Sequence, residues 1–180
     1  MRDGSMDADE WRRTRSALSE LSALPIHLDT KPAQSIDMIA SKARRLATRL
    51  QREGKPLRLL VVDYAQLIRS PGKSTEERQS GVSQGLLALA KELQIPVLAL
   101  AQLNRDCEKR ADKRPQLSDL RGSGQWEQDA HAIVFVYRDA YYNPMCGHNT
   151  TELIVAKYRD HKTVTLYLKF TPETQRFTEA

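Results

Sequence analysis

The stretch LRLLVVDYAQL, Leu57–Leu67, decides the fold class because it is an apolar run that ends in an acid. Six residues, apolar except for Arg58, lead directly to Asp63. Such a run, without alternation of polar and apolar residues, is typical of a strand buried on both faces of a parallel sheet. A second run, VLALAQ at 97–102, has the same character. A helical pattern separates the two runs, so the sequence predicts a strand, a helix and a parallel strand.

The remaining elements extend this unit in both directions. We expect helices at Asp7–Leu24, Ser35–Glu53 and Ser74–Leu93, and further strands at Ile26–Asp29, Ala132–Tyr137, Glu152–Ala156 and Val164–Phe170. The basic residues of the second helix suit a solvated face or a nucleic-acid contact. The order of elements predicts an α/β domain with a central, largely parallel sheet and flanking helices.

The composition is that of a globular protein and leaves the partner open. The chain has 180 residues, 40% hydrophobic and 28% charged, which suits one domain with a core. No apolar run approaches the roughly 18 residues that span a bilayer, and the polar, acidic N-terminus lacks the apolar stretch of a secretory signal. We therefore expect a cytoplasmic protein without a membrane partner. The net charge of +5 is compatible with a polyanionic partner but does not demand one.

The two cysteines, Cys107 and Cys146, lie in polar surroundings. Their positions match no metal-ligand spacing. We therefore expect neither a disulfide framework nor a zinc site.

Asp63 and Gln102 end two separate strands of the predicted sheet. In open α/β sheets, ligands bind at the carboxyl ends of the strands, so polar residues there are placed for chemistry. An acid after four apolar residues is how a Walker B segment is built, in which the carboxylate holds Mg²⁺ through water. An Asp that caps the turn after a strand is the alternative, and the segment alone does not decide between the two.

The stretch PGKST, Pro71–Thr75, follows a strand and precedes a helix, as a phosphate-binding P-loop does. The motif G-x-x-x-x-G-K-[ST] needs a glycine at position 67, where this chain has Leu67. Without that glycine the backbone amides do not readily form the phosphate nest. A turn followed by a helix cap explains Gly72 and Ser74 better.

Four motifs follow one another along the chain: VVDYAQL (61–67), PVLALAQLNR (96–105), KRPQLSDLRGSGQWEQDA (113–130) and AKYRDHKT (156–163). Together they resemble the RecA-like motor domain of the DnaB-type replicative DNA helicases. The resemblance covers nearly the whole chain, from the acidic helix around Trp11 to Phe177. Its central block, from Leu89 to Ala130, is not a pattern that generic ATPases produce.

The resemblance implies nucleotide-binding and catalytic roles for four residues. Asp63 matches the Walker B aspartate that coordinates Mg²⁺, and Gln102 matches the glutamine that senses the γ-phosphate of ATP and passes its state to the DNA loops. Lys157 and Arg159 match the basic pair that reaches the γ-phosphate of the neighbouring subunit, with Arg159 as the arginine finger. An ammonium and a planar guanidinium can neutralise charge on a transferring phosphoryl group. Taken without the resemblance, the same charged residues are typical of an edge strand whose charges keep the protein soluble.

The stretch DLRGSGQ, Asp119–Gln125, matches the family's pore loop for single-stranded DNA. The resemblance therefore implies DNA-binding roles for Arg121, Gly122, Ser123 and Gly124. Glycines let the backbone approach a phosphate, and an arginine adds a charge-assisted contact that carries no sequence information. Many relatives have an acidic residue where this chain has Gly122. A flexible glycine turn is the alternative.

The family's motor begins with a strand, a P-loop and a helix, followed by a strand with the catalytic glutamate. In the family these precede the acidic helix with which this chain opens. We therefore expect 1–180 to be a single partial RecA-like domain, the C-terminal part of the motor, with a leading helix at about 1–24 and a sheet core at 25–180. Without Walker A and the glutamate, we expect this polypeptide alone neither to bind ATP tightly nor to hydrolyse it.

Three functional interpretations stay open. In the first, the chain is a portion of an ATP- and Mg²⁺-dependent helicase, a hexameric ring that unwinds duplex DNA by translocating on single-stranded DNA, with a loader or primase as possible partners. In the second, it is a non-catalytic truncated module that binds DNA or a helicase ring without hydrolysing ATP. A third class, other RecA-like hexameric ATPases such as recombinases, is disfavoured by DLRGSGQWEQDA.

Overall fold

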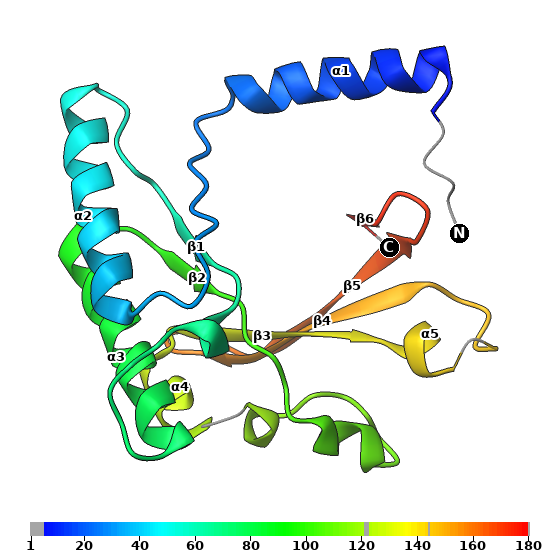
Figure 1. Ribbon diagram of the computed structural model, residues 1–180. Coiled ribbons are helices and arrows are strands. Elements are labelled where there is room, and N and C mark those ends of the chain that lie inside the picture. Colours follow the sequence, from blue (N-terminus) through cyan, green and yellow to red (C-terminus); the bar gives the residue numbers. More distant parts are fainter. Residues whose placement is uncertain (1–5, 121–122, 144, 180) are drawn as a thin grey trace. The chain divides into compact units, whose positions relative to one another are not determined.

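The computed structural model describes residues 6–120, 123–143 and 145–179, and the chain divides into two compact units, Met1–Pro32 and Ala33–Ala180. The helices and strands are labelled in Figure 1. In chain order they are α1 (Ala8–Ala23), α2 (Ile36–Arg52), β1 (Leu60–Val62), η1 (Ala65–Leu67), α3 (Thr75–Leu93), β2 (Val97–Ala99), η2 (Arg105–Lys109), η3 (Leu117–Asp119), α4 (Ser123–Asp129), β3 (Ala132–Arg138), α5 (Asp139–Tyr142), β4 (Thr150–Tyr158), β5 (Val164–Thr171) and β6 (Arg176–Glu179). No helix among the described residues is long and apolar enough to cross a membrane.

The N-terminal unit consists of α1 and an extended segment after it. Asp7 caps the helix by accepting a hydrogen bond from the Glu10 N–H at 2.8 Å, and the Glu10 carboxylate accepts one from the Asp7 N–H at 3.0 Å. This reciprocal cap is the one that the sequence predicts. The strand predicted at Ile26–Asp29 is wrong, because no strand among the described residues pairs with this segment.

The larger unit contains the predicted strand, helix, strand arrangement. β1 and β2 pair in parallel, with Val61 opposite Leu98, and α2 and α3 lie side by side next to them (Figure 1). Helix α3 begins at the predicted cap, Ser74, and α2 is capped by Ser35, where the sequence predicted only the start of a helix. Each serine hydroxyl oxygen accepts a backbone N–H. The buried core lies between these helices and one face of the strands, and its members are Ile36, Ala40, Ala43, Ile68, Val82, Leu86 and Leu89. The α/β class is therefore confirmed.

The second sheet has the order β3-β4-β5-β6, and all of its pairings are antiparallel. The strands predicted at Glu152–Ala156 and Val164–Phe170 are present and paired as β4 and β5. We expected them to close the sheet at its edge, but they lie in its middle, because β6, which the sequence did not predict, pairs with β5. The connections between these strands are short. Antiparallel neighbours allow this, whereas parallel neighbours need a crossover connection of about a dozen residues or more. Among the described residues, parallel pairing of strands is therefore confined to β1 and β2.

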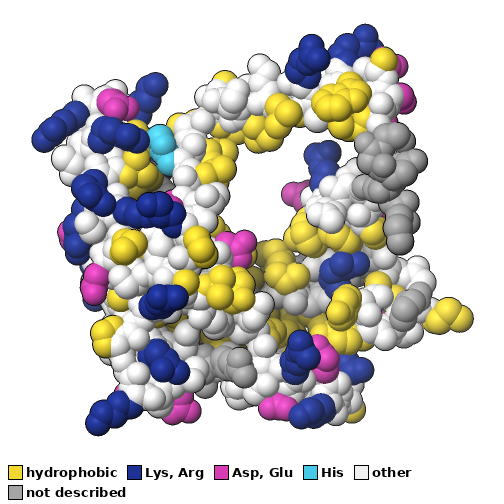
Figure 2. All heavy atoms as spheres, in the orientation of Figure 1, with side chains coloured by type: hydrophobic (Ala, Val, Ile, Leu, Met, Phe, Trp, Pro, Cys, Tyr) yellow, Lys and Arg dark blue, Asp and Glu magenta, His cyan; other side chains and the backbone are white. Residues whose placement is uncertain are grey.

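The β1–β2 pair is covered by helices on one face and open on the other. Leu60, Val62, Val97 and Ala99 pack toward the helices. The alternate side chains stay 41–54% exposed, and they are Leu59, Val61, Leu98 and Leu100. Figure 2 shows hydrophobic side chains exposed over the strands. Parallel strands are normally buried on both faces, and an apolar run such as this predicts that burial. Among the described residues, however, these four side chains stay about half exposed.

We predict that Gly85→Ala destabilises the protein although alanine favours helices. A Cβ at position 85 would lie 2.3 Å from Cγ1 of Ile36, so α2 and α3 would have to separate. Overpacking costs about 1–3 kcal/mol, and an approach of 2.3 Å belongs to the upper part of that range, about 2–3 kcal/mol. Alanine gains about 1 kcal/mol in helix propensity, so the expected net loss is about 1–2 kcal/mol in the free energy of unfolding. Urea denaturation measures this loss.

Gly124→Ala is the matched control for this substitution. Gly124 lies in α4, and no described atom lies within 4 Å of the position of its added Cβ. We expect unchanged or higher stability there. Equal stability of Gly85→Ala and the unsubstituted protein would contradict the close α2–α3 contact.

Candidate nucleotide and DNA site

Asp63 and Gln102 follow neighbouring strands, as the sequence predicts. Beyond β1 and β2 the two segments stay paired, because the Leu100 N–H donates to the Val62 carbonyl and the Ala65 N–H donates to the Leu100 carbonyl, each at 2.9 Å. Asp63 lies between Val62 and Ala65, the two residues that bond to Leu100, and it is exposed. The peptide bond that follows it is cis. The structure therefore brings a carboxylate and an amide side chain to one edge of the parallel sheet.

Gln66 holds the backbone of Gln102. Its side-chain oxygen accepts the Gln102 N–H at 3.2 Å, and its side-chain nitrogen donates to the Gln102 carbonyl at 3.1 Å. These two bonds leave the exposed Gln102 side chain available for a ligand. The sequence analysis missed Gln66, because an amide in the turn after a strand does not reveal which distant backbone it binds.

The Asp63 carboxylate fits a water-mediated magnesium ligand. No backbone N–H, side-chain donor or cation among the described residues bonds to it, so the alternative role as a turn cap has no support in that part of the chain. Mg²⁺ keeps several waters and takes one or two carboxylates from a protein. One exposed carboxylate at a strand end therefore suits the outer coordination of Mg²⁺, and phosphates would supply further oxygens.

The stretch PGKST forms a helix cap and not a phosphate cradle. The Ser74 hydroxyl accepts the Glu77 N–H at 3.0 Å, and the Lys73 N–H donates to the Glu77 carboxylate at 2.6 Å. A phosphate nest needs such amides free, and here an internal carboxylate already occupies one of them. The predicted turn and cap at Gly72 and Ser74 are confirmed.

The predicted DNA loop is only partly described. Arg121, Gly122 and the side chain of Ser123 lie outside the described residues, and Gly124 is exposed in the first turn of α4. The segment that enters the loop is well defined. An isolated antiparallel bridge pairs Leu103 with Leu120, and the Asn104 N–H donates to the Asp119 carbonyl at 2.7 Å. The entry to the loop is thus bonded to the residues that follow Gln102.

Asp119 is buried at this junction and paired with Arg110. The guanidinium donates two hydrogen bonds to the carboxylate at 2.8 and 2.6 Å, and the Gln116 N–H donates a third at 2.8 Å. The Arg110 hydrogen bonds hold the pKa of the Asp119 carboxyl below its usual value. Such charge-assisted, bidentate bonds fix the loop entry in one position.

Lys157 and Arg159 lie together at the C-terminal end of α4. The Lys157 ammonium donates to the carbonyls of Ala130 at 2.7 Å and Gln128 at 3.3 Å, and also to the carbonyl of Glu127. Arg159 donates to the Gln128 carbonyl at 3.1 Å. Cations are favourable at a helix C-terminus, where carbonyl groups lack partners. The basic pair therefore binds the end of the helix that begins in the DNA loop.

Ser83 fixes α4 from the other side. Its hydroxyl donates to the Asp129 carboxylate at 2.8 Å, and the Gln125 amide donates to the second Asp129 oxygen at 2.9 Å. Ser83 belongs to α3, whose inner face packs against β1 and β2. The helix after the predicted DNA loop is therefore bonded both to α3, which packs on the parallel strands, and to the basic pair at the end of β4.

Comparisons with known proteins show the family to which the chain belongs. The sequence model of the DnaB-like helicase C terminal domain matches residues 1–179. Replicative DNA helicase DnaB of Geobacillus stearothermophilus is 41% identical over 181 residues, which cover 98% of this chain and 39% of that protein. The Mycobacterium leprae DnaB helicase is 43% identical over 182 residues, which cover 99% of this chain and 29% of that protein. The chain thus spans well under half the length of these curated relatives.

Two solved structures are also similar. A DnaB-like replicative helicase, described with its interactions with primase, superposes with a TM-score of 0.88 at 38% identity, covering 99% of this chain and 42% of that one. A second structure, of an isolated ATPase domain, has the same TM-score and identity, with 99% of this chain and 62% of that domain covered. The predicted RecA-like fold is therefore confirmed.

We predict that Asp119→Asn costs about 2–3 kcal/mol of unfolding free energy at pH 7, because it leaves the partly buried Arg110 without a counter-charge. The sign of the pH dependence follows from the lowered pKa. The ion pair contributes its full stability above the unfolded pKa of about 4, and this contribution is lost as the pH falls through the folded value. Urea denaturation at pH 7 and in acid measures both effects.

Asp106→Asn is the control in the same segment. Asp106 pairs with Lys109 at 2.6 Å, but both side chains are exposed. We expect a change within about 0.5 kcal/mol for this pair. The anchoring role of the buried pair would be contradicted if the two variants lost the same unfolding free energy. It would also be contradicted if the loss for Asp119→Asn were as large in acid as at pH 7.

Proposed function

Since the chain belongs to the DnaB-like helicase C-terminal domain family, we propose that it serves as the DNA-contacting part of an ATP-driven replicative helicase. In this proposal, six such domains form a ring that translocates on single-stranded DNA and unwinds the duplex. The observation that carries the proposal is the continuous bonding from Gln102, through Leu103 and Asn104, to Asp119 at the loop entry. A motor needs such a connection between its nucleotide sensor and its DNA loop.

Each residue has a defined role in this proposal. Asp63 holds Mg²⁺ through water, and Gln102 contacts the γ-phosphate of ATP at the same sheet edge. Arg121, with the amides of 122–124, binds DNA phosphates. When ATP and Mg²⁺ are bound, the metal neutralises phosphate charge; the chain's own residues orient the phosphates and transmit their state.

Lys157 and Arg159 have two possible partners in this proposal. In one state they bind the carbonyls at the end of α4, as observed. In the other they bind the γ-phosphate held by the neighbouring subunit, which carries more negative charge than the carbonyls do. Exchange between these partners would release the end of α4. The neighbour's nucleotide would then influence the DNA loop at the start of the same helix.

The open apolar face of β1 and β2 is the surface on which the rest of an ATPase domain would pack. The matched region covers 62% of the isolated ATPase domain found by structural comparison, so that domain has further residues with no counterpart in these 180. Burying a leucine or valine side chain contributes about 1.5–3 kcal/mol, so four half-exposed ones favour a covering segment. We propose that a phosphate-binding segment covers this face.

A non-catalytic DNA-binding module is the second candidate. It is favoured by the contacts of Lys157 and Arg159 with the end of α4, which hold the helix after the loop without any nucleotide. Both candidates predict DNA binding by the loop, and they differ in whether a P-loop completes the site. Only the first candidate, the replicative helicase, implies a loader or primase partner. Only that candidate implies a hexameric ring through which one DNA strand passes.

We predict that the purified chain binds single-stranded DNA in a salt-dependent way and that Arg121→Ala weakens this binding about 3- to 10-fold. Loss of one phosphate contact should also reduce the slope of log affinity against log salt by about 0.7. Fluorescence anisotropy with labelled oligonucleotides of different sequence measures both quantities. Affinity should vary little with sequence, because phosphate contacts do not read bases.

Arg45→Ala is the matched control, since Arg45 lies on the exposed basic face of α2. Its substitution should leave affinity and salt slope nearly unchanged. If Arg45→Ala weakens binding and Arg121→Ala does not, DNA binds α2 and the loop assignment is wrong.

We predict no Mg²⁺-dependent ATP hydrolysis by the 180 residues alone, because the P-loop lysine and amides that grip the phosphates are not among them. A coupled phosphate-release assay measures this, with Asp63→Asn as the control for contaminating activity. Hydrolysis by the purified chain that is lost in Asp63→Asn would contradict the prediction.

A further inference from the structure

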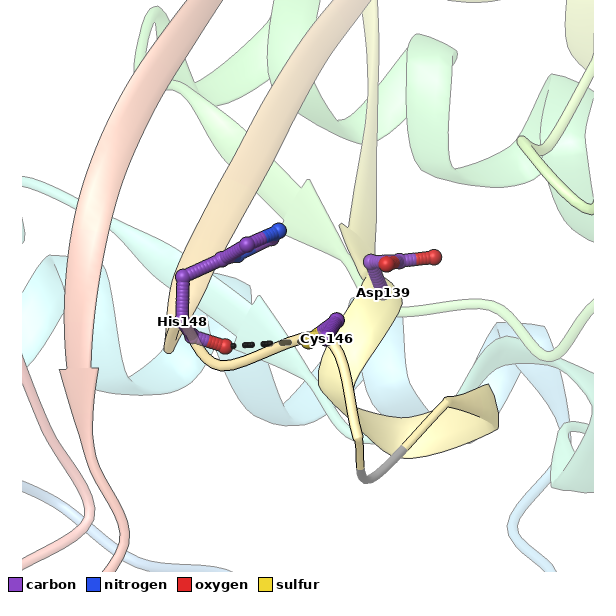
Figure 3. A group of neighbouring side chains, drawn as sticks. All are labelled: Asp139, Cys146 and His148. Carbon is purple, nitrogen blue, oxygen red and sulfur yellow. Dashed lines mark hydrogen bonds between the residues drawn. The ribbon is translucent and has the colours of Figure 1, made fainter.

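Three side chains with metal-binding groups converge at the end of the β3–β4 hairpin. Asp139 is the first residue of α5, and Cys146 and His148 belong to the connection between α5 and β4. Their ligand atoms, a carboxylate oxygen, a sulfur and a ring nitrogen, all lie within 4.8 Å of one another. Figure 3 shows Cys146 on the loop between the other two side chains.

The antiparallel pairing of β3 and β4 brings these residues together. Arg138 at the end of β3 lies opposite Thr151 on β4, so Asp139 emerges beside the last residues of the connection. Cys146 and His148 are separated by one residue and reach the same place from the loop. The cysteine spacing in the sequence gives no sign of a zinc site because the third group, Asp139, belongs to the preceding element.

The chemistry of the three groups selects one class of metal. A thiolate, an imidazole and a carboxylate are ligands of Zn²⁺, whereas Mg²⁺ and Ca²⁺ prefer oxygen alone. Zinc–ligand bonds of about 2.0–2.3 Å at tetrahedral angles place ligand atoms about 3.3–3.8 Å apart. The observed cluster would therefore contract by about 1.5 Å at most on binding. His148 is exposed on a connecting loop, where its side chain has room to adjust.

Asp139 is held in place by a buried phenol. The Tyr137 hydroxyl donates to one Asp139 oxygen at 2.9 Å, and the Tyr137 side chain is only 6% exposed. Metal-binding carboxylates are commonly oriented by such a hydrogen bond, which leaves the second oxygen for the metal. The Cys146 thiol donates to the His148 carbonyl at 3.3 Å, a weak bond that ends when the thiol loses its proton.

We propose that Asp139, Cys146 and His148 bind one Zn²⁺ ion, with water in the fourth position. The thiol proton leaves to solvent when the ion binds. The ion would tie the connection after α5 to the end of β3. This proposal does not depend on the helicase function, since the basic pair lies at the other end of the hairpin, where Ala132 is opposite Tyr158. Six residues of strand, about 20 Å, separate the two ends.

Titration of the full 180-residue chain with Zn²⁺ and with Co²⁺ tests the proposal. We expect saturable binding of one ion, and a cobalt spectrum with both the visible bands of tetrahedral coordination and a near-ultraviolet thiolate-to-cobalt charge-transfer band. Cys146→Ser should abolish the charge-transfer band and weaken Zn²⁺ binding at least tenfold. His148→Ala should weaken binding by a similar factor.

Two substitutions serve as matched controls. Cys107 is buried, and its thiol donates to the Asn104 carbonyl at 3.1 Å, so Cys107→Ser keeps a donor there and should change neither spectrum nor affinity. His27 lies in the N-terminal unit and is exposed, and His27→Ala should likewise have no effect. Circular dichroism of each variant establishes that its fold is intact.

Tyr137→Phe tests the positioning role of the phenol. It should weaken zinc binding about tenfold while the charge-transfer band remains, because all three ligands are still present. Zn²⁺ should raise the melting temperature of the unsubstituted chain and not that of Cys146→Ser. Absence of saturable binding, or binding that Cys146→Ser and His148→Ala leave unchanged, would overturn the site and identify surface adsorption only.

Discussion

Asp119 and Arg110 form an ion pair where the chain enters the loop for which we propose DNA binding, and the geometry of the candidate site depends on this pair. The carboxylate is buried and accepts hydrogen bonds from the guanidinium and from the Gln116 N–H. A buried carboxylate without such partners would cost several kcal/mol. With them, it fixes the backbone whose carbonyl accepts the Asn104 N–H. Hydrogen bonds therefore join the loop entry to the segment that follows Gln102.

The exit from the DNA loop is fixed by a different set of bonds. α4 leaves the loop directly and ends in carbonyls bound by Lys157 and Arg159, while Asp129 accepts a hydrogen bond from Ser83. The entry is thus bonded to the segment that would sense the chain's own nucleotide. The exit is bonded to the pair that, in the proposed ring, would sense the neighbour's nucleotide. In the proposed ring, both nucleotides would therefore act on one short loop.

The sequence predicted the parts of this structure that local patterns determine. Caps such as Asp7 and Ser74, the apolar strands and the position of Asp63 all follow from short-range rules. Gln66 and Arg110 were not predicted, because their partners lie at sites that only the tertiary fold brings near. The Ile26–Asp29 segment shows the converse error, since its residues suit a strand but no described strand pairs with it.

The cysteines show the same limit of pattern reasoning. Cys107 and Cys146 have no ligand spacing in the sequence, yet Cys146 lies near Asp139 and His148 because an antiparallel hairpin returns the chain to its starting point. Lys157 and Arg159 were assigned through the family as residues that reach another subunit. Within one chain they cap a helix, a role that no motif describes.

The most direct test of the account is single-stranded DNA stimulation of ATP hydrolysis in a completed domain. The P-loop segment that the proposed function requires would be sought in the part of the Geobacillus stearothermophilus relative that the match does not cover and joined to these 180 residues. We predict Mg²⁺-dependent hydrolysis that DNA accelerates, and in Gln66→Ala a much weaker acceleration by DNA, because the Gln102 backbone is then no longer held. A completed domain that binds ATP and DNA without any acceleration, or full acceleration in Gln66→Ala, would contradict the proposed connection between sensor and loop.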